Sequence, residues 1–432
     1  MKRALRYGIA AFVFALPFGT KKFVTALIPQ LFEYSREFSS FFVYATDVLA
    51  AILLVALALY LGRRSRPVPL APWLTAFAAL ALASTFFALN APYAAYVAAS
   101  FVVALFAAAF IAVALREGIV EVRALFAAFA ASATFQAIIA IVQFYYQKSI
   151  GLWFLGEVLI TQTTAGIARV DIGGVKFLRA YGTLPHANIL AGFLVMGLIA
   201  CAYLYLSAPR GHAVRHGAVA VSTFLILVAL VLTFSRSGWI VAGVSVLVTL
   251  AYAFWNGELR RRAGWFLGVV LVSSAAIALS LGWAVSARAG FAKGEFSIDH
   301  RVFYNEMGLM LVREHPQGVG IGNEVLQAAE EGLFQGKGLT QPWLWQPVHN
   351  IYILIADELG GAGLLLFLAI LFLVMRRTRF SSAPDVFALF MLASLLLFGA
   401  VDHFPWDLHA GRLMFWVAFG ILMGSEMETK PL

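Results

Sequence analysis

The chain is built from a succession of long apolar runs that short polar segments separate. A window of about 19 residues delimits eleven runs. Most are close to the ~20 helical residues that cross the apolar core of a bilayer. The runs cover residues 38–62, 71–89, 93–115, 124–146, 185–206, 217–234, 238–255, 264–286, 350–375, 384–404 and 411–424.

A shorter apolar run at 7–19 precedes these eleven. The basic residues Lys2, Arg3 and Arg6 lie before it, as they would before the apolar part of a signal peptide. No clean small-x-small cleavage site follows, so we interpret the run as a retained segment. The sequence therefore predicts about twelve transmembrane helices.

Composition supports this interpretation. Hydrophobic residues make up 62% of the 432 residues and charged residues only 12%, whereas soluble domains carry about 25% charge. We expect an all-α, polytopic helical bundle that forms one integral-membrane domain over 1–432. The single cysteine, Cys201, excludes an intramolecular disulfide.

The basic residues indicate an orientation in the membrane. The net charge of +9 resides in short clusters between apolar runs, which is typical of cytoplasmic loops and not of a nucleic-acid-binding surface. With the amino terminus inside, the inner side carries a net +11 and the rest −2. We therefore expect a bacterial inner-membrane protein with both termini cytoplasmic. The inner basic residues are Lys2, Arg3, Arg6, Arg63, Arg64, Arg66, Arg116, Arg123, Arg210, Arg215, Arg260, Arg261, Arg262, Arg376, Arg377, Arg379 and Lys430.

This topology exposes two sizeable segments on the outer side, 147–184 and 287–348, while every inner loop is short. Chemistry is therefore expected outside. A secondary transporter would also have about twelve helices, but its polar residues should lie near the midplane of related halves. No internal repeat is visible here, and the informative residues gather at one face.

His349 and Asn350 stand where the second outer segment enters an apolar helix. At 100° per residue, Ala356, Gly360 and Gly363 share the direction of His349, and a ridge of small residues lets another helix approach. The histidine should therefore point into the bundle. An imidazole there can orient a hydroxyl or take its proton. The alternative is a residue that only caps or anchors the helix.

Three arginines and one polar residue, Asn188, are further candidates on the predicted outer side. Arg236 lies in a tight turn between two apolar runs, where a guanidinium can bind a lipid-linked phosphate or can simply snorkel. Arg301 lies in the first turn of a predicted helix that ends before Pro316. Arg179 precedes the helix that carries Asn188. For Arg179 and Asn188, a purely structural role remains an open alternative to binding a ligand.

Other polar residues are interpreted as structural. Asp357 and Glu358 point about 100° apart, so we expect a structural pairing for at least one of them. GVGIGN at 318–323 is interpreted as a flexible turn, and Glu324 as part of a solvated acidic face. DHFPWDLH at 402–409 could bind a cation, but Pro405 and Trp406 favour an interfacial turn with an aromatic anchor. We expect no metal site.

Taken together, four segments in order resemble the O-antigen ligase family, which also includes O-antigen polymerases and some protein O-glycosylating transferases. They are RAYGTLPHANILAGFL, TFSRSGW, the stretch from Arg301 through HPQGVGIGNE, and HNIYILIADELGGAG. The last fits the family pattern of histidine, a small polar residue, nine residues, glycine, two residues and glycine. Its positions are His349, Asn350, Gly360 and Gly363, and the resemblance covers roughly residues 175–375.

The resemblance implies a GT-C-like glycosyltransferase that works at the periplasmic face without metal or cofactor. Such enzymes move a glycan from undecaprenyl pyrophosphate to an acceptor hydroxyl, which in the ligases belongs to the lipid A-core. Matched by position, His349 is the motif histidine, Arg236 and Arg301 are the essential outer arginines, and Arg179 is a weaker match. Arginines would stabilise the leaving pyrophosphate while His349 activates or orients the hydroxyl, which predicts inversion.

Two related activities stay open. An O-antigen or exopolysaccharide polymerase would use the same donor with a second lipid-linked glycan as acceptor, and the histidine-to-glycine pattern favours the ligase. A protein O-oligosaccharyltransferase is less favoured, because the chain stops soon after its last predicted helix. The donor sugars and the oligomeric state do not follow from the sequence.

Overall fold

The computed structural model describes residues 1–28, 39–62, 67–68, 70–161, 163–164, 166–208, 213–289 and 296–425. Several residues that carry the predicted charge asymmetry lie outside these ranges, and so does part of the predicted segment 287–348. Those residues are Arg63, Arg64, Arg66, Arg210 and Lys430.

Each of the twelve predicted apolar runs contains a helix. Among the described residues, seven helices are long and apolar enough to cross a membrane: α5, α6, α7, α8, α9, α10 and α14. The chain is therefore a multi-pass membrane protein, while twelve crossings and the GT-C-like arrangement remain predictions. The helices in the runs are α1 (Lys2–Ala15), α3 (Ala45–Leu61), α4 (Ala71–Ala83), α5 (Ala91–Arg116), α6 (Val122–Tyr146), α7 (Ala187–Leu206), α8 (Ala213–Leu232), α9 (Arg236–Trp255), α10 (Arg260–Ala289), α14 (Ile351–Arg377), α15 (Ala383–Gly399) and α16 (His409–Ser425).

The described part of the chain is mostly helical, as expected for an all-α bundle, and it also contains two short β-hairpins. In the first, β1 (Lys21–Ala26) pairs antiparallel with β2 (Ser40–Tyr44). The predicted helical run 38–62 therefore contains a strand, and its helix begins only at Ala45. The segment SFFVY combines aromatic and β-branched residues with alternating burial, which suits a strand. The second hairpin joins β3 (Arg169–Ile172) to β4 (Val175–Leu178).

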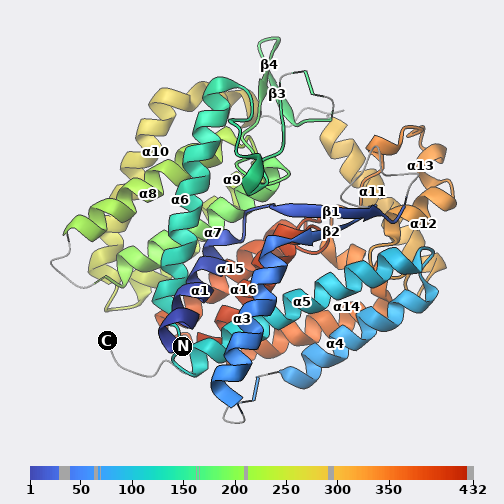
Figure 1. Ribbon diagram of the computed structural model, residues 1–432. Helices are drawn as coiled ribbons and strands as arrows, with labels where there is room; N and C mark the ends of the chain where they lie inside the picture. Colours follow the sequence, from blue (N-terminus) through green and yellow to red (C-terminus); the bar gives the residue numbers. More distant parts are fainter. Residues whose placement is uncertain are drawn as a thin grey trace.

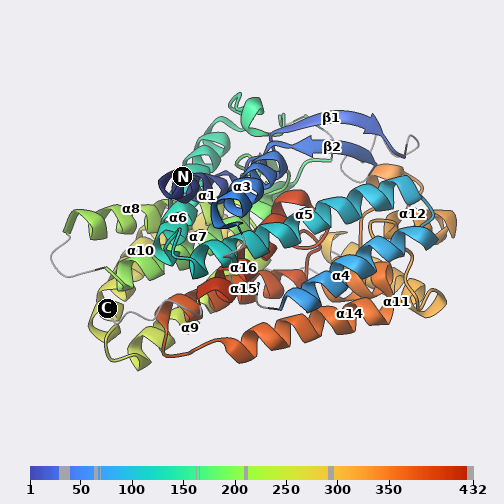
Figure 2. The same cartoon turned by 60° about the horizontal axis from the view of Figure 1, so that its bottom comes forward.

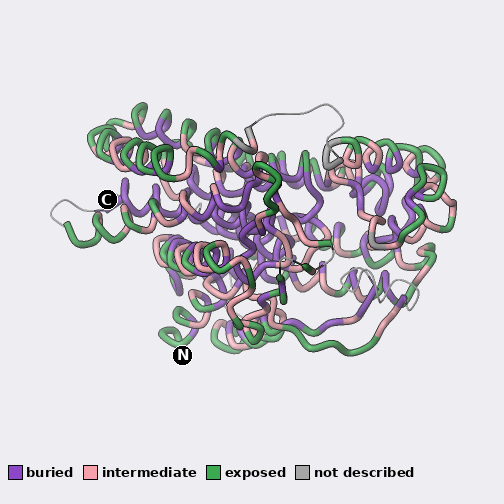
Figure 3. The backbone as a smooth tube through the Cα atoms, turned by 90° about the horizontal axis from the view of Figure 1, so that it is seen from above, coloured by how far each residue is buried: buried purple, intermediate pink, exposed green. Residues whose placement is uncertain are grey.

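The buried centre of the bundle is formed by α7, in which every residue is buried, and by α16, which is buried from Ala410 to Ser425 (Figure 3). Helix α16 packs closely along α5 because glycines remove side chains from the contact. A Cβ on Gly420 would lie 2.5 Å from the Ala108 carbonyl oxygen, and one on Gly424 would lie 2.8 Å from Ala112 Cα. Small residues at such positions let membrane helices approach backbone to backbone.

The longer outer segment adds small helices beside the bundle. They are α11 (Phe296–Glu314), α12 (Glu324–Glu330) and α13 (Leu333–Gly336), followed by the 3₁₀ turn η5 (Pro342–Leu344). Figures 1 and 2 show the amino terminus toward one end of the molecule and α11 and α12 at the other. The predicted carboxyl terminus lies outside the described residues, and which side is cytoplasmic stays a prediction.

Candidate functional site

The predicted site residues are brought together at the end of the bundle that carries the outer segments. Helices α7, α9, α14 and α16 all begin near them, so four helix amino termini meet there. Each amino terminus presents unpaired N–H groups and a partial positive charge. This end of the bundle is therefore suited to an anion before any side chain is considered.

Arg179 is held rigidly beside the start of α7. Its Nε donates to the Thr233 carbonyl oxygen at 2.6 Å, and its Nη2 donates to Asn188 Oδ1 at 2.6 Å. A backbone hydrogen bond from Ala180 to Leu232 at 3.0 Å fixes the same two segments. With 8% of its surface exposed, the guanidinium has little freedom to move.

Asn188 links Arg179 to a second arginine. Its Nδ2 donates to Asp402 Oδ2 at 2.9 Å, and the same oxygen lies 3.6 Å from Arg301 Nη2. We call Arg179, Asn188, Asp402 and Arg301 the arginine network. Burial opposes ionisation of Asp402, but the positive charges of His403 and Arg301 outweigh it and hold the pKa of Asp402 below its usual range. The network therefore carries an anionic centre between two cations.

Two more arginines lie around this network. Arg236 is the first residue of α9, half-buried, directly after the cap residue Ser235 and three positions after Thr233. Arg288, which the sequence analysis did not single out, lies one turn after Ala284 of α10. Ala284 packs against Val170 and Phe234, next to Ser235.

Electrostatics place Arg288 close to the network. The pKa of Arg179 is lowered to about 10, first by burial and then by the charges of Arg288 and Arg301, against the opposing effect of Tyr181. Arginines that repel one another at rest are favourable for binding a polyvalent anion, because the anion relieves the repulsion. The site is thus strongly cationic, with Asp402 as its resting counter-ion.

His349 lies between α11, which carries Arg301, and the turn 400–408. Tyr304, one turn after Arg301, stacks on the His349 ring with centroids 5.4 Å apart. His349 Nδ1 lies 2.9 Å from the Pro347 carbonyl oxygen, which can only accept, so Nδ1 carries the proton. In the neutral ring, Nε2 therefore presents a lone pair. Burial lowers the pKa of His349, and the charge of His403 lowers it further.

Asn350 has a structural role in placing His349. Its Oδ1 accepts from the backbone N–H groups of Tyr352 at 2.9 Å and Ile353 at 3.2 Å, and so caps α14. Its Nδ2 donates to the Ala400 carbonyl oxygen at 3.3 Å, which ties the start of α14 to the turn after α15. The neighbour His349 is fixed by the same cap.

His186 is the N-cap of α7, which begins at Ala187, two residues after the start of the predicted run 185–206. Its Nδ1 accepts from the Asn188 backbone N–H at 3.1 Å, so the proton of the neutral ring is on Nε2. Burial lowers the pKa of His186 to about 3, and the charge of Arg179 contributes. His186 is therefore a neutral donor beside the arginine network.

The turn 400–408 differs from its sequence interpretation. Trp406 is no interfacial anchor, since it is 4% exposed and its Nε1 donates to Glu358 Oε2 at 2.7 Å. This bond confirms a structural pairing for Glu358. His403 Nδ1 lies 2.8 and 2.9 Å from the two oxygens of Asp407, and its ring contacts His349 edge to face with centroids 4.8 Å apart. The acidic and basic residues of this turn therefore complete the site.

The two motif glycines act differently from the expected ridge. Helix α14 is interrupted at Gly360, whose φ of 69° and ψ of 179° are not helical. The turn 316–320 enters the interruption, and the N–H groups of Val319 and Gly320 bond the carbonyl oxygens of Asp357 and Glu358 at 2.8 and 3.0 Å. A Cβ on Gly363 would meet Leu359 of its own helix at 2.3 Å. The predicted turn exists, but it is tightly packed.

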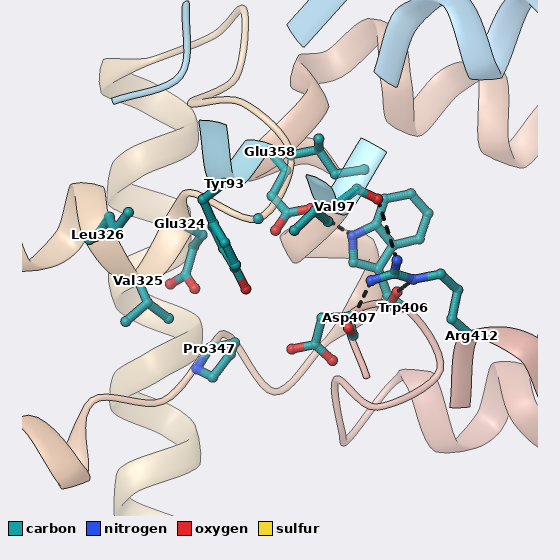
Figure 4. Close-up of a pocket in the computed structure, with 12 residues that line it drawn as sticks. Tyr93, Val97, Glu324, Val325, Leu326, Pro347, Glu358, Trp406, Asp407 and Arg412 are labelled. Atoms are coloured by element: carbon teal, nitrogen blue, oxygen red, sulfur yellow. Dashed lines mark hydrogen bonds between the residues drawn. The ribbon is translucent and has the colours of Figure 1, made fainter. Parts of the chain in front are cut away.

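A pocket close to the site is lined in part by Pro347 and Asp407, and Figure 4 shows its lining. The volume of this pocket, including its open mouth, is about 510 Å³. Glu324 was expected on a solvated face, yet it is 1% exposed and faces this pocket. Within the described part of the chain, its carboxylate oxygens accept no hydrogen bond. The polar lining residues are Tyr93, Glu324, Glu358, Trp406, Asp407 and Arg412.

The comparison with known families follows the same segments. Residues 221–368 match the family model described as O-antigen ligase. No curated protein matches the chain. The matched segment contains Arg236, Arg301 and His349, whereas Arg179 and Asp402 join the site from outside it.

Proposed function

From the match of residues 221–368 to the family model described as O-antigen ligase, we propose that the protein is a lipid-linked glycan ligase. The family consists of glycosyltransferase-like enzymes of glycan assembly. In the proposed reaction, a glycan moves from undecaprenyl pyrophosphate to a sugar hydroxyl of the lipid A-core at the periplasmic face. The observation that carries the proposal is the arginine network beside His349.

The arginines would hold the donor's pyrophosphate. Breaking the sugar–phosphate bond leaves its electron pair on the pyrophosphate, so negative charge builds on the leaving group. A guanidinium offers five N–H donors in a planar fork that matches phosphate oxygens. Arg179 is fixed by the Thr233 carbonyl and Asn188, while 34% of the Arg301 side chain is exposed. Arg301 therefore faces the donor, and Arg179 supplies charge from behind.

His349 would act on the acceptor. Its Nε2 lone pair can accept the hydroxyl hydrogen, because Nδ1 is occupied by its proton and the Pro347 carbonyl. The hydroxyl oxygen then attacks the anomeric carbon as the bond to phosphate breaks. A single displacement with the arginines on one side and the hydroxyl on the other inverts the configuration.

The proposal is tested by the lipopolysaccharide gel profile of a ligase-deficient host that expresses the wild type or a variant. The wild type should restore the high-molecular-weight ladder, and His349→Ala and Arg301→Ala should abolish it. Arg313→Ala is the matched control, since Arg313 is exposed near the end of the same helix α11. An unchanged profile in this host would refute the ligase. In a polymerase-deficient host, extension of core that carries a single repeat to a ladder would instead indicate a polymerase, and an unchanged profile in both hosts would refute both activities.

A further inference from the structure

The turn 400–408 contains a histidine–carboxylate pair that the proposed reaction has not yet used. His403 and Asp407 are four residues apart and lie 2.8 Å from nitrogen to oxygen. Both side chains are largely buried, at 9% and 11% exposed. A pair of this kind, in contact with the ring proposed to accept a proton, requires an explanation beyond packing.

The hydrogen bond fixes the tautomer of His403. Because a carboxylate only accepts, Nδ1 carries the proton and Nε2 is the nitrogen with a lone pair when the ring is neutral. Both rings of the His349–His403 contact therefore have Nε2 as their basic atom. The two rings contact each other edge to face, and Nδ1 of His349 is committed to Pro347, so a proton that leaves His349 for His403 would have to leave from Nε2.

The surroundings make His403 the better holder of positive charge. Burial alone would lower the pKa of His403, but the neighbouring carboxylate of Asp407 raises it above the usual value, with a further contribution from Asp402 and against the charge of Arg301. The pKa of His349 is instead lowered, first by burial and then by His403. The charged and titratable groups that face the two rings are Arg301, Tyr304, Asp402, Asp407 and His186.

We propose that His403, held by Asp407, receives the proton that His349 removes from the acceptor hydroxyl. The inference rests on the proposed transfer reaction and adds a step to it. The O–H bond breaks as the C–O bond forms, and the proton passes to His349 Nε2 and then to His403 Nε2. The electron pair of the broken sugar–phosphate bond leaves with the pyrophosphate. His403 does not touch the acceptor, so it is a positioning residue that acts through His349.

The pH dependence of transfer distinguishes this relay from a role for His349 alone. Activity requires both rings to be neutral at the start, so the acidic limb of kcat/KM reports the first protonation of the pair. Asp407→Asn removes the charge that stabilises the His403 imidazolium. If the proton ends on His403, the limb moves to lower pH by about one unit or more. If His349 alone is the base, the loss of a neighbouring positive charge moves the limb to higher pH.

The experiment measures transfer from a lipid-linked glycan in proteoliposomes of the full-length protein between about pH 5 and pH 9. For His403→Gln we expect a fall in kcat of about 100-fold and a limb shifted to lower pH. Asp407→Glu, which keeps the carboxylate, should recover the wild-type limb. The matched control is His315→Gln, since His315 forms a similar pair with Glu331 at 2.6 Å outside the site.

Each outcome has a distinct meaning. A limb that stays in place or moves to higher pH in both His403→Gln and Asp407→Asn would overturn the relay. If Asp407→Asn does not fold, the position of the acidic limb in the His403→Gln profile decides between the relay and His349 acting alone. An inactive wild type would refute the proposed function itself, whereas an active wild type with unshifted variants would refute only the relay.

Discussion

The interruption of α14 at Gly360 makes a sharp test of how this fold is held together. Gly360→Ala places a Cβ 2.7 Å from the Gln317 carbonyl carbon and oxygen and from the Pro316 carbonyl oxygen, all backbone atoms. Its φ of 69° with ψ of 179° is a region that is essentially restricted to glycine and costs other residues about 1–3 kcal/mol. Displacing the packed turn adds about 1–3 kcal/mol. We therefore expect a destabilisation of about 2–6 kcal/mol.

The adjacent Gly361 is the matched control. Nothing lies within 4 Å of a Cβ at Gly361, and its φ is not in the left-handed region. Gly361→Ala should therefore be neutral or stabilising by about 0.5–1 kcal/mol. Cys201, the single cysteine, is fully buried in α7, so the thermal onset of its reaction with a fluorogenic thiol reagent reports unfolding. Equal onset temperatures for Gly360→Ala and Gly361→Ala would refute the argument.

Three further predictions concern the arginine network. Arg179→Lys should lower transfer about 100-fold, because a lysine cannot make the fork of bonds to Thr233 and Asn188; retention of wild-type kcat in the proteoliposome assay would contradict this. Asn188→Leu should destabilise the protein by about 2–5 kcal/mol, since it leaves buried Arg179 and Asp402 without their bridge; an unchanged onset of the Cys201 reaction would show that the bridge is unimportant. Treatment with a chelator should leave the transfer rate unchanged, as arginines supply the charge, whereas a rate restored only by added Mg²⁺ would contradict the metal-independent mechanism.

Much of the fold could be predicted from the sequence because membrane helices are recognised by the length and hydropathy of their apolar runs. The two hairpins could not, since SFFVY is as apolar as the helix that it precedes. The interruption at Gly360 was also missed. A periodicity argument assumes an unbroken helix, and the break depends on the turn 316–320, which is distant in sequence.

The candidate site, like the fold, could be predicted only in part from the sequence. His349, Arg301 and Arg236 could be found because they stand alone at helix ends and match a family pattern. Asp402, His403 and Asp407 lay in a conspicuous run of two aspartates and two histidines, but proline and tryptophan favoured an interfacial turn. The signal for Arg288 was weaker still, because an arginine at the end of a long apolar helix usually anchors it at the membrane surface.

The central claim is the transfer of a lipid-linked glycan at this site, and one measurement tests it most directly. Purified protein in proteoliposomes is supplied with a labelled glycan on undecaprenyl pyrophosphate and with lipid A-core, and the label on the acceptor is counted against the undecaprenyl pyrophosphate released. The account predicts a one-to-one ratio for the wild type and no transfer for His349→Ala. Release of undecaprenyl pyrophosphate without labelled acceptor, or full transfer by His349→Ala, would contradict it.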